Sequence, residues 1–380
     1  MIRALIGLAL LLSCTAPMGD RVQPTVSASA SPKVQAVLSP TPEPTALAAS
    51  RIVAADVVHV AVTGELADTW AVEAVLDDGT LLIRLAPDPA KGRHGVSIGK
   101  MDSRTGRVTV LVEVAVGRQM GYFSVFGNTM SWVEVNVSDL AALDWRLHVT
   151  DAMTGIDRVV QTDPGLRIRG SGPWVYSYRP VFWQEPSSLL YTILVPGAGN
   201  PSTQLRRLIG ERTEVLTTIP DASRNVLARL AADERSVAWV ESELPMTSYV
   251  ATSALVVRDN ATGAMRRVAI PSGFILRFAG DDIVIGAKDG VFVVDRKLEA
   301  PLRHLVDVAN VEFMAILGDD VVFSSSNDHR LQAVRRSGGA PTLLDTEVVR
   351  GPYQANGGNG LMAWLRVAGG ERSIGVLPLR

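Results

Sequence analysis

The segment Asp102-Ser103-Arg104-Thr105-Gly106 recurs in outline twice more, as Asp151-Ala152-Met153-Thr154-Gly155 and as Asp259-Asn260-Ala261-Thr262-Gly263. Each copy separates two runs in which apolar and polar residues alternate, the pattern of half-buried β-strands. An Asp side chain can accept hydrogen bonds from the backbone two residues on, and a Gly four positions later supplies a positive φ. We therefore predict three β-hairpin turns with these structural residues: Asp102, Gly106, Asp151, Gly155, Asp259 and Gly263.

The spacing of these turns indicates a repeated fold. The copies begin at positions 102, 151 and 259, so they lie 49 and 108 residues apart, close to one and two lengths of a repeating unit. Repeats of about 40–55 residues that contain several short strands are typical of β-propeller blades. The sequence thus predicts an all-β propeller in which each of these turns joins the last two strands of a four-stranded blade.

A second phrase, apolar–small–Trp–apolar–charged, sets the register of the blades. It occurs at Met130–Glu134, Val237–Glu241 and Met362–Arg366. We assign it to the second strand of a blade, with Trp packed between neighbouring blades. The equivalent positions in the other blades are predicted to be Ile83, Trp183, Ile285 and Phe323. About seven blades result, while six or eight also fit, with boundaries at 70–118, 119–164, 165–221, 222–271, 272–308, 309–350 and 351–380.

The last unit, 351–380, is short and has room for about three strands. The segment Val57–Val62 precedes the first blade and has strand character. We predict that it completes the last blade and closes the ring between the two termini, since closure removes the open sheet edges that invite aggregation. The propeller domain is expected to span 51–380.

The N-terminus has the features of a targeting segment. Arg3 precedes a nine-residue apolar run, Ala4–Leu12, which is too short for a membrane-spanning helix. The residues that end this region, Leu11-Leu12-Ser13-Cys14, resemble the signal of bacterial lipoproteins, in which a small residue precedes an invariant Cys. The resemblance implies removal of a signal peptide, 1–13, and lipidation of Cys14, the chain's only cysteine. An ordinary secretory signal is the alternative.

Residues 14–50 are dominated by Pro, Ser, Thr, Ala and Val. Such a composition cannot bury enough apolar surface to offset the entropy lost on ordering, so we predict a disordered tether, extended by its prolines. With lipid on Cys14, the tether would hold the propeller away from a cell membrane, facing the periplasm or the cell exterior.

Few features of the sequence indicate catalysis, metal binding or nucleic-acid binding. The 37 basic and 39 acidic residues give a net charge of −2 without a basic tract, which argues against nucleic-acid binding. The five histidines fall in different predicted blades, and the sequence lacks metal, phosphate-loop, cofactor and hydrolase motifs. The acidic pairs at 281–282 and 319–320 repeat at equivalent hairpins, so we interpret them as turn residues rather than catalytic carboxylates. We predict no catalytic residue, metal or cofactor.

One segment, Pro173–Trp183, holds five of the chain's 21 aromatic residues within ten positions. Trp174, Tyr176 and Tyr178 share one face of an extended strand, and with Arg179 they would make a surface suited to a sugar, peptide or protein. The alternative is an irregular blade with a heavier core. A weaker candidate for binding is the polar loop Ser324–Arg330.

The blades resemble the divergent propeller repeats of bacterial envelope proteins, including the propeller of the Tol system and quinoprotein-like propellers. The resemblance covers roughly 51–380 and rests on the Asp-x-x-Thr-Gly hairpins and the Trp strands. It implies a fold rather than an activity. We expect a lipid-anchored, non-catalytic module that binds an envelope protein, peptide or glycan. The alternatives are a propeller enzyme that acts on envelope or extracellular glycans and a solute-sensing component of a membrane complex.

Overall fold

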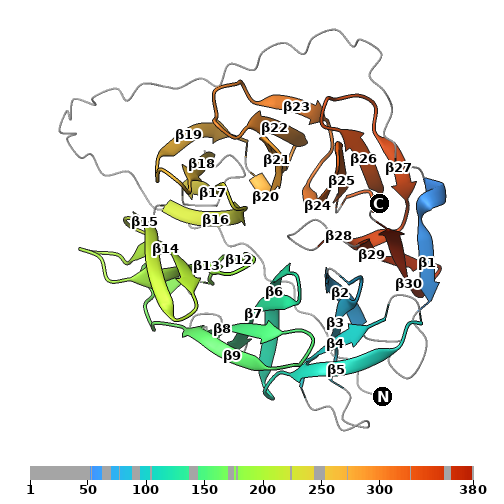
Figure 1. Ribbon diagram of the computed structural model, residues 1–380, viewed down its shortest axis with the longest axis horizontal. Helices are drawn as coiled ribbons and strands as arrows, with labels where there is room; N and C mark the ends of the chain where they lie inside the picture. Colours follow the sequence, from blue (N-terminus) through green and yellow to red (C-terminus); the bar gives the residue numbers. More distant parts are fainter. Residues whose placement is uncertain are drawn as a thin grey trace, which may run out of the picture. The chain divides into compact units, whose positions relative to one another are not determined.

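Seven four-stranded antiparallel sheets surround a central axis in the computed structural model, as Figure 1 shows. The structure describes residues 52, 54–61, 70–76, 78–87, 95–102, 105–136, 144–169, 175–176, 179–222, 225–243, 253–271, 273–325, 327–354 and 361–378. Each sheet is one blade, and in blades 1 to 6 the first strand in chain order lies nearest the axis, whereas in blade 7 the innermost strand is β28. The prediction of a seven-bladed β-propeller is confirmed.

The first three blades use strands β2 to β9 and β12 to β15, in chain order from the axis outward. Blade 1 contains β2 (Trp70–Val75), β3 (Leu81–Leu85), β4 (Ser97–Met101) and β5 (Val108–Glu113). Blade 2 contains β6 (Arg118–Phe126), β7 (Thr129–Asn136), β8 (Trp145–Asp151) and β9 (Asp157–Thr162). Blade 3 contains β12 (Phe182–Gln184), β13 (Leu189–Val195), β14 (Ser202–Ile209) and β15 (Arg212–Ile219).

The next three blades follow the same order. Blade 4 contains β16 (Asn225–Ala232), β17 (Ser236–Glu243), β18 (Ser253–Asp259) and β19 (Met265–Ile270). Blade 5 contains β20 (Gly273–Ala279), β21 (Asp282–Ala287), β22 (Val291–Asp295) and β23 (Arg303–Val306). Blade 6 contains β24 (Val311–Leu317), β25 (Asp320–Ser325), β26 (Leu331–Arg335) and β27 (Thr342–Asp345).

Blade 7 combines the two ends of the described chain. It contains β28 (Val348–Tyr353), β29 (Leu361–Ala368) and β30 (Glu371–Pro378), and its outermost strand is β1 (Val58–Ala61). β1 pairs antiparallel with β30, from Val58 opposite Val376 to Ala61 opposite Ser373. The innermost strands of neighbouring blades contact one another around the ring, including β28 of blade 7 and β2 of blade 1. The predicted closure by the segment at 57–62 is confirmed.

Two small elements lie outside the blades. A single 3-10 turn, η1 (Ala54–Asp56), precedes β1, and β10 (Ile168–Arg169) pairs with β11 (Val175–Tyr176) between blades 2 and 3. Within the described ranges, no helix is long and apolar enough to cross a membrane.

The three predicted turns have one geometry. In the second copy, Asp151 Oδ1 accepts hydrogen bonds from the Met153 and Thr154 amides at 2.8 and 2.9 Å, and the Gly155 amide donates to the Asp151 carbonyl at 2.8 Å. The glycines at 106, 155 and 263 have φ of 69°, 75° and 72°, a region that favours Gly. All three turns join the third and fourth strands of a blade, as predicted.

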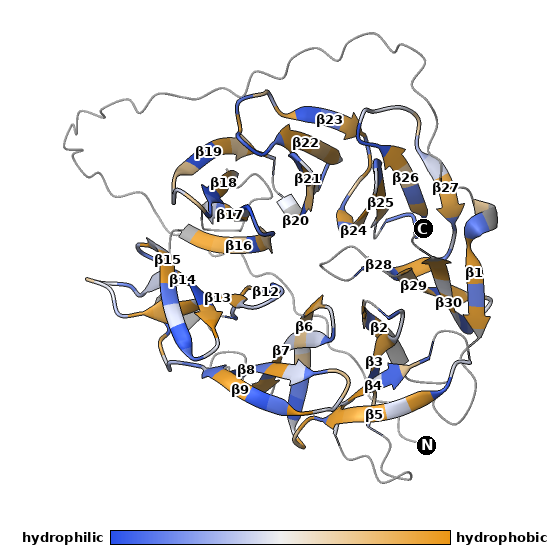
Figure 2. Cartoon of the chain, viewed as in Figure 1, coloured by the Kyte–Doolittle hydropathy of each residue, from blue (hydrophilic) through white to orange (hydrophobic). Residues whose placement is uncertain are grey.

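The core lies between the blades, because apolar side chains of neighbouring sheets pack in shared clusters. Figure 2 shows that hydrophobic residues recur along the strands of all the blades. Trp132, Trp239 and Trp364 sit on the second strands of blades 2, 4 and 7 and are at most 1% exposed. Trp239 packs in one cluster with residues of blades 3 and 5. These tryptophans fill the spaces between blades, as predicted.

The assignment of Trp183 to a second strand is wrong. Trp183 lies on β12, the innermost strand of blade 3, and pairs with Leu190 on β13. The hairpin closed by Glu185 and Ser188 corresponds to the one closed by Asp233 and Ser236 in blade 4, so the counterpart of Trp239 is Tyr191 on β13. Tyr191 is 3% exposed and packs in one cluster with residues of blade 2, so an aromatic side chain also fills this position in blade 3.

Candidate functional site

The ring has two faces with different chemistry. Because successive strands of a blade are antiparallel, the turns between its first and second and its third and fourth strands share one face, which we call the turn face. The turns between second and third strands and the connections to the next blade share the opposite face, which we call the connection face. The Asp-x-x-Thr-Gly hairpins all lie on the turn face.

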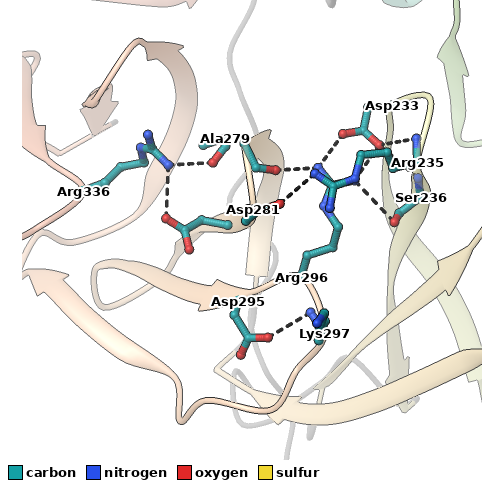
Figure 3. A network of polar contacts seen from close by, with 11 residues as sticks. Asp233, Arg235, Ser236, Ala279, Asp281, Asp295, Arg296, Lys297 and Arg336 are labelled. Atoms are coloured by element: carbon teal, nitrogen blue, oxygen red, sulfur yellow. Dashed lines mark hydrogen bonds and ion pairs between the residues drawn. The ribbon is translucent and has the colours of Figure 1, made fainter.

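On the turn face, arginines tie neighbouring blades together (Figure 3). Arg296 of blade 5 donates two hydrogen bonds to the Asp233 carboxylate of blade 4, at 2.7 and 2.6 Å, and a third to the Gly280 carbonyl at 2.6 Å. Arg336 of blade 6 donates to the Ala279 carbonyl of blade 5 at 2.6 Å. Each arginine follows the last residue of a third strand, so the same position connects a blade to the preceding one.

Three of the four carboxylates in the repeated acidic pairs belong to this network; the fourth, Asp320, is buried, and its Oδ1 has no hydrogen-bond partner among the described residues. Asp281 pairs with Arg235 at 2.7 Å, and Arg336 reaches Asp282 at 3.1 Å and Asp319 at 2.8 Å. These carboxylates therefore act as hairpin residues and counter-ions for arginines that join blades. The sequence signal for this network is an arginine directly after the third strand, at Arg296 and Arg336, which is not among the features predicted above.

Blade 2 contains a polar group, the blade 2 cluster, made of the buried Trp132, His148 and Thr150 and the exposed Asp157. The indole N–H of Trp132 donates to the Thr150 hydroxyl at 2.9 Å, and that hydroxyl donates to Asp157. His148 Nδ1 lies 2.7 Å from the Asp157 carboxylate, and its ring stacks on Trp132 with centroids 4.1 Å apart. Burial raises the pKa of Asp157, but the hydrogen bonds from His148 and Thr150 outweigh it and leave the pKa below its usual value. The buried His148 Nε2 lies 3.4 Å from a Glu134 carboxylate oxygen and makes no hydrogen bond to a described residue.

A charged cluster also lies where the ring closes. One carboxylate oxygen of Glu73 on β2 lies 2.6 Å from a guanidinium nitrogen of Arg84 and 2.9 Å from one of Arg350 in blade 7. Burial raises the pKa of Glu73, against the pull of the two guanidinium groups. Nowhere in the described part of the chain do three His, Cys, Asp or Glu side chains gather in a way that could hold a metal ion.

A groove on the connection face has a different composition. It lies between blades 6 and 7 with a volume of about 430 Å³, and it is lined by Asp328, His329, Arg330, Thr346, Glu347, Val349 and Val367. Polar groups come from the turn after β25 and from the short connection between β27 and β28. The exposed Val349, which is 44% accessible, adds an apolar surface. Mixed polar and apolar lining of this kind suits recognition of a peptide or a sugar.

The backbone of this groove is strained. His329 and Glu347 have φ of 53° and 59°, although neither is glycine. Each such residue costs on the order of 1 kcal/mol, so the surroundings must hold it. The Val348 amide donates to the His329 carbonyl at 2.9 Å, and the Val367 amide donates to the Glu347 carbonyl at 3.0 Å. The Glu347 carboxylate also accepts a hydrogen bond from the Arg366 guanidinium at 2.9 Å. The groove is therefore a preformed surface.

The predicted binding residues meet different outcomes. Of the polar loop, Ser324 and Ser325 are buried and donate to the Gly351 and Ala309 carbonyls, so only the Asp328–Arg330 part lines the groove. Tyr176 lies on β11 opposite Ile168, and Arg179 is exposed just before β12. Trp174, Tyr178 and the lipidation residue Cys14 lie outside the described residues. The aromatic surface therefore stays a prediction.

Comparison with known proteins identifies the fold. No family model matches the chain, and no curated protein matches it. The β-propeller domain of the Trilobed protease from Pyrococcus furiosus is 11% identical, with 82% of this chain and 93% of that chain covered and a TM-score of 0.52.

Two other solved propellers have lower TM-scores. TolB from Acinetobacter baumannii is 16% identical over 69% of this chain and 62% of that chain, with a TM-score of 0.42. An oligogalacturonate lyase solved in complex with manganese is 13% identical over 84% and 78%, with a TM-score of 0.46. At these identities the likeness concerns architecture: the chain is a divergent seven-bladed β-propeller.

Proposed function

We propose that this protein is a lipid-anchored, extracytoplasmic binding module, and that the groove between blades 6 and 7 holds a protein, peptide or glycan of the cell envelope. The observation that carries the proposal is the preformed groove itself. Two residues in left-handed conformations, His329 and Glu347, shape a surface with both charged and apolar side chains. Strain of this kind persists where the surroundings over-determine it, often at binding sites.

The anchor rests on the sequence. Leu11-Leu12-Ser13-Cys14 follows a charged residue and a short apolar run, and the Pro-rich tether extends to about residue 50. A single lipidated residue and a long tether would present the propeller to partners in the envelope without a spanning helix.

A non-catalytic role is supported by the carboxylates. Three carboxylates of the acidic pairs on the turn face, Asp281, Asp282 and Asp319, are ion-paired to Arg235 or Arg336. A carboxylate held by a guanidinium favours its charged form and is poorly suited to donate a proton. The proposal therefore assigns these residues to the stability of the ring.

The binding role is tested by crosslinking the full-length protein in its own cells and capturing it, with Val349→Arg as the test variant. The new charge enters the groove, so we expect a partner seen with the natural protein to fall at least tenfold. Val159→Arg is the matched control, because Val159 is 47% exposed on the outer strand of blade 2. Equal capture by all three proteins, or no partner above background with any of them, would contradict the proposal.

The anchor is tested separately with Cys14→Ala. We expect an alkyne-tagged fatty acid to label the natural protein and to leave the variant unlabelled, and the variant to leave the membrane fraction. Labelling that is independent of Cys14, or no labelling of either protein, would exclude the anchor without affecting the groove.

A further inference from the structure

A cation stacks on an aromatic ring beside the axis of the propeller. The Arg277 guanidinium on β20 lies over the Trp183 ring of β12, with its central carbon 5.2 Å from the ring centroid. One of its N–H groups donates to the Leu276 carbonyl at 2.9 Å. A guanidinium has five N–H donors in one plane, so the ring fixes its face and leaves the edge for other acceptors.

The repeat explains how blades 3 and 5 come to meet. Four-residue hairpins at 185–188, 233–236 and 279–282 join the first and second strands of blades 3, 4 and 5. The residues two positions before these hairpins are Trp183, Ala231 and Arg277. They therefore occupy one level of three successive inner strands. Blade 4 contributes only a methyl group at this level, and Ala231 is fully buried. A small residue between them lets the Arg277 side chain pass across blade 4 to reach Trp183.

The charge on Arg277 has no counter-ion among the residues that the structure describes. No carboxylate in those ranges forms an ion pair with it, and burial alone lowers its pKa to about 10. Because pH 7 lies roughly three units below this pKa, the charged form of Arg277 outnumbers the neutral form by about a thousand to one. A desolvated cation of this kind gains more from an incoming anion than one in open water does.

Other charged groups on the innermost strands favour an anion as well. Arg229 on β16 is an exposed arginine. Arg350 and Arg84 share the single carboxylate of Glu73. Glu312 on β24 is the exposed acid on these strands among the described residues. The described inner strands and their partners therefore hold more cations than anions near the axis.

We propose that Arg277, held flat on Trp183, is a recognition point for an oxyanion, either a carboxylate or a phosphate, carried by a ligand that reaches the ring axis. The in-plane N–H pair of a guanidinium matches two oxygens of either group. This site is independent of the groove between blades 6 and 7 and of the lipid anchor, so either can fail without the other.

The test is calorimetric titration of the 51–380 domain with sodium citrate and with inorganic phosphate, each at an ionic strength matched with sodium chloride. We expect at least one of the two anions to bind to the natural domain and to bind at least tenfold more weakly to Arg277→Ala. Arg158→Ala is the matched control, because Arg158 is an exposed arginine on the outer strand of blade 2. Citrate alone would identify a carboxylate site, and phosphate alone a phosphoryl site.

Two further variants separate recognition from general charge. Arg277→Lys keeps the charge but loses the paired donors, and we expect several-fold weaker binding with unchanged thermal unfolding of the free domain. Trp183→Phe keeps an aromatic face, so we expect most of the affinity to remain. The proposal is overturned if neither anion binds, if Arg277→Ala binds as tightly as the natural domain does, or if Arg158→Ala loses as much affinity as Arg277→Ala.

Discussion

Replacing Arg296 by Ala should cost the fold far more than replacing Arg235 by Ala, although both arginines pair with an Asp on the turn face at similar distances. The Arg296 side chain is 9% exposed and makes two bonds to Asp233, whereas Arg235 is 61% exposed and its partner Asp281 is 82% exposed. Removing one partner of a buried pair costs about 3–5 kcal/mol. Because Asp233 is one-third exposed, we expect about 3 kcal/mol for Arg296→Ala. Water and salt screen an exposed pair, so we expect Arg235→Ala to leave the unfolding midpoint close to that of the natural domain.

Urea unfolding of the 51–380 domain measures both changes. A loss of about 3 kcal/mol lowers the folded-to-unfolded ratio roughly a hundredfold and moves the midpoint, while the slope stays constant. Arg296→Lys should recover part of the loss, since it keeps the charge but not the paired donors. Equal costs for the two Ala variants would refute the idea that burial, rather than the presence of an ion pair, determines how firmly blades 4 and 5 are joined.

Three further predictions concern other parts of the ring. Asp157→Asn should lower the free energy of unfolding by about 1–2 kcal/mol at pH 7. The pKa of this carboxyl in the folded protein lies below the ordinary 3.8, so the difference between the natural domain and the variant should disappear as the pH falls through that pKa. Unfolding curves measured at a series of pH values test this. Gly375→Ala should cost on the order of 3 kcal/mol, since a Cβ there would come within 2.1 Å of the buried Trp364 ring, and a melting temperature equal to that of the natural domain would contradict this. Cysteines at Val60 and Ile374, which face each other on β1 and β30, should form a disulfide in the 51–380 domain, and free thiols after oxidation would argue against the closed ring.

The fold was predictable because its signals are local and repeated. In the turn at Asp259, the carboxylate accepts the Thr262 amide at 2.8 Å, and Gly263 takes a positive φ within five residues of chain. The short last unit also showed that a strand was missing, and the segment at 57–62 was available to supply it. Such features need no knowledge of distant residues.

Blade 3 shows where the periodic argument fails. Trp183 follows Trp132 by 51 residues, about one repeat, and this spacing predicts that both lie on second strands. In the structure, β9 ends at Thr162 and β12 begins at Phe182, and the β10–β11 pair lies in the connection between them. This longer connection shifts the register, so an aromatic residue at the expected distance lies on the first strand instead of the second. An irregular connection cannot be recognised from spacing alone.

The candidate sites depend on contacts that no local pattern encodes. Arg277 and Trp183 are 94 positions apart on blades 5 and 3, and the residue at the same level of blade 4 is Ala231. The groove needs left-handed backbone at His329 and Glu347, which the tertiary structure imposes on residues that do not prefer it. Sequence identified one part of the groove, the polar loop after β25, because loops of that composition lie at the surface.

The most direct test of the central proposal is a photo-crosslinking amino acid at position 349 in the full-length protein, in its own cells, compared with the same group at position 159. We predict that irradiation joins the group at 349 to a defined envelope protein, peptide or glycan, and that the group at 159 gives only background. Equal products from both positions, or none from 349, would contradict the assignment of the groove between blades 6 and 7 as the binding site.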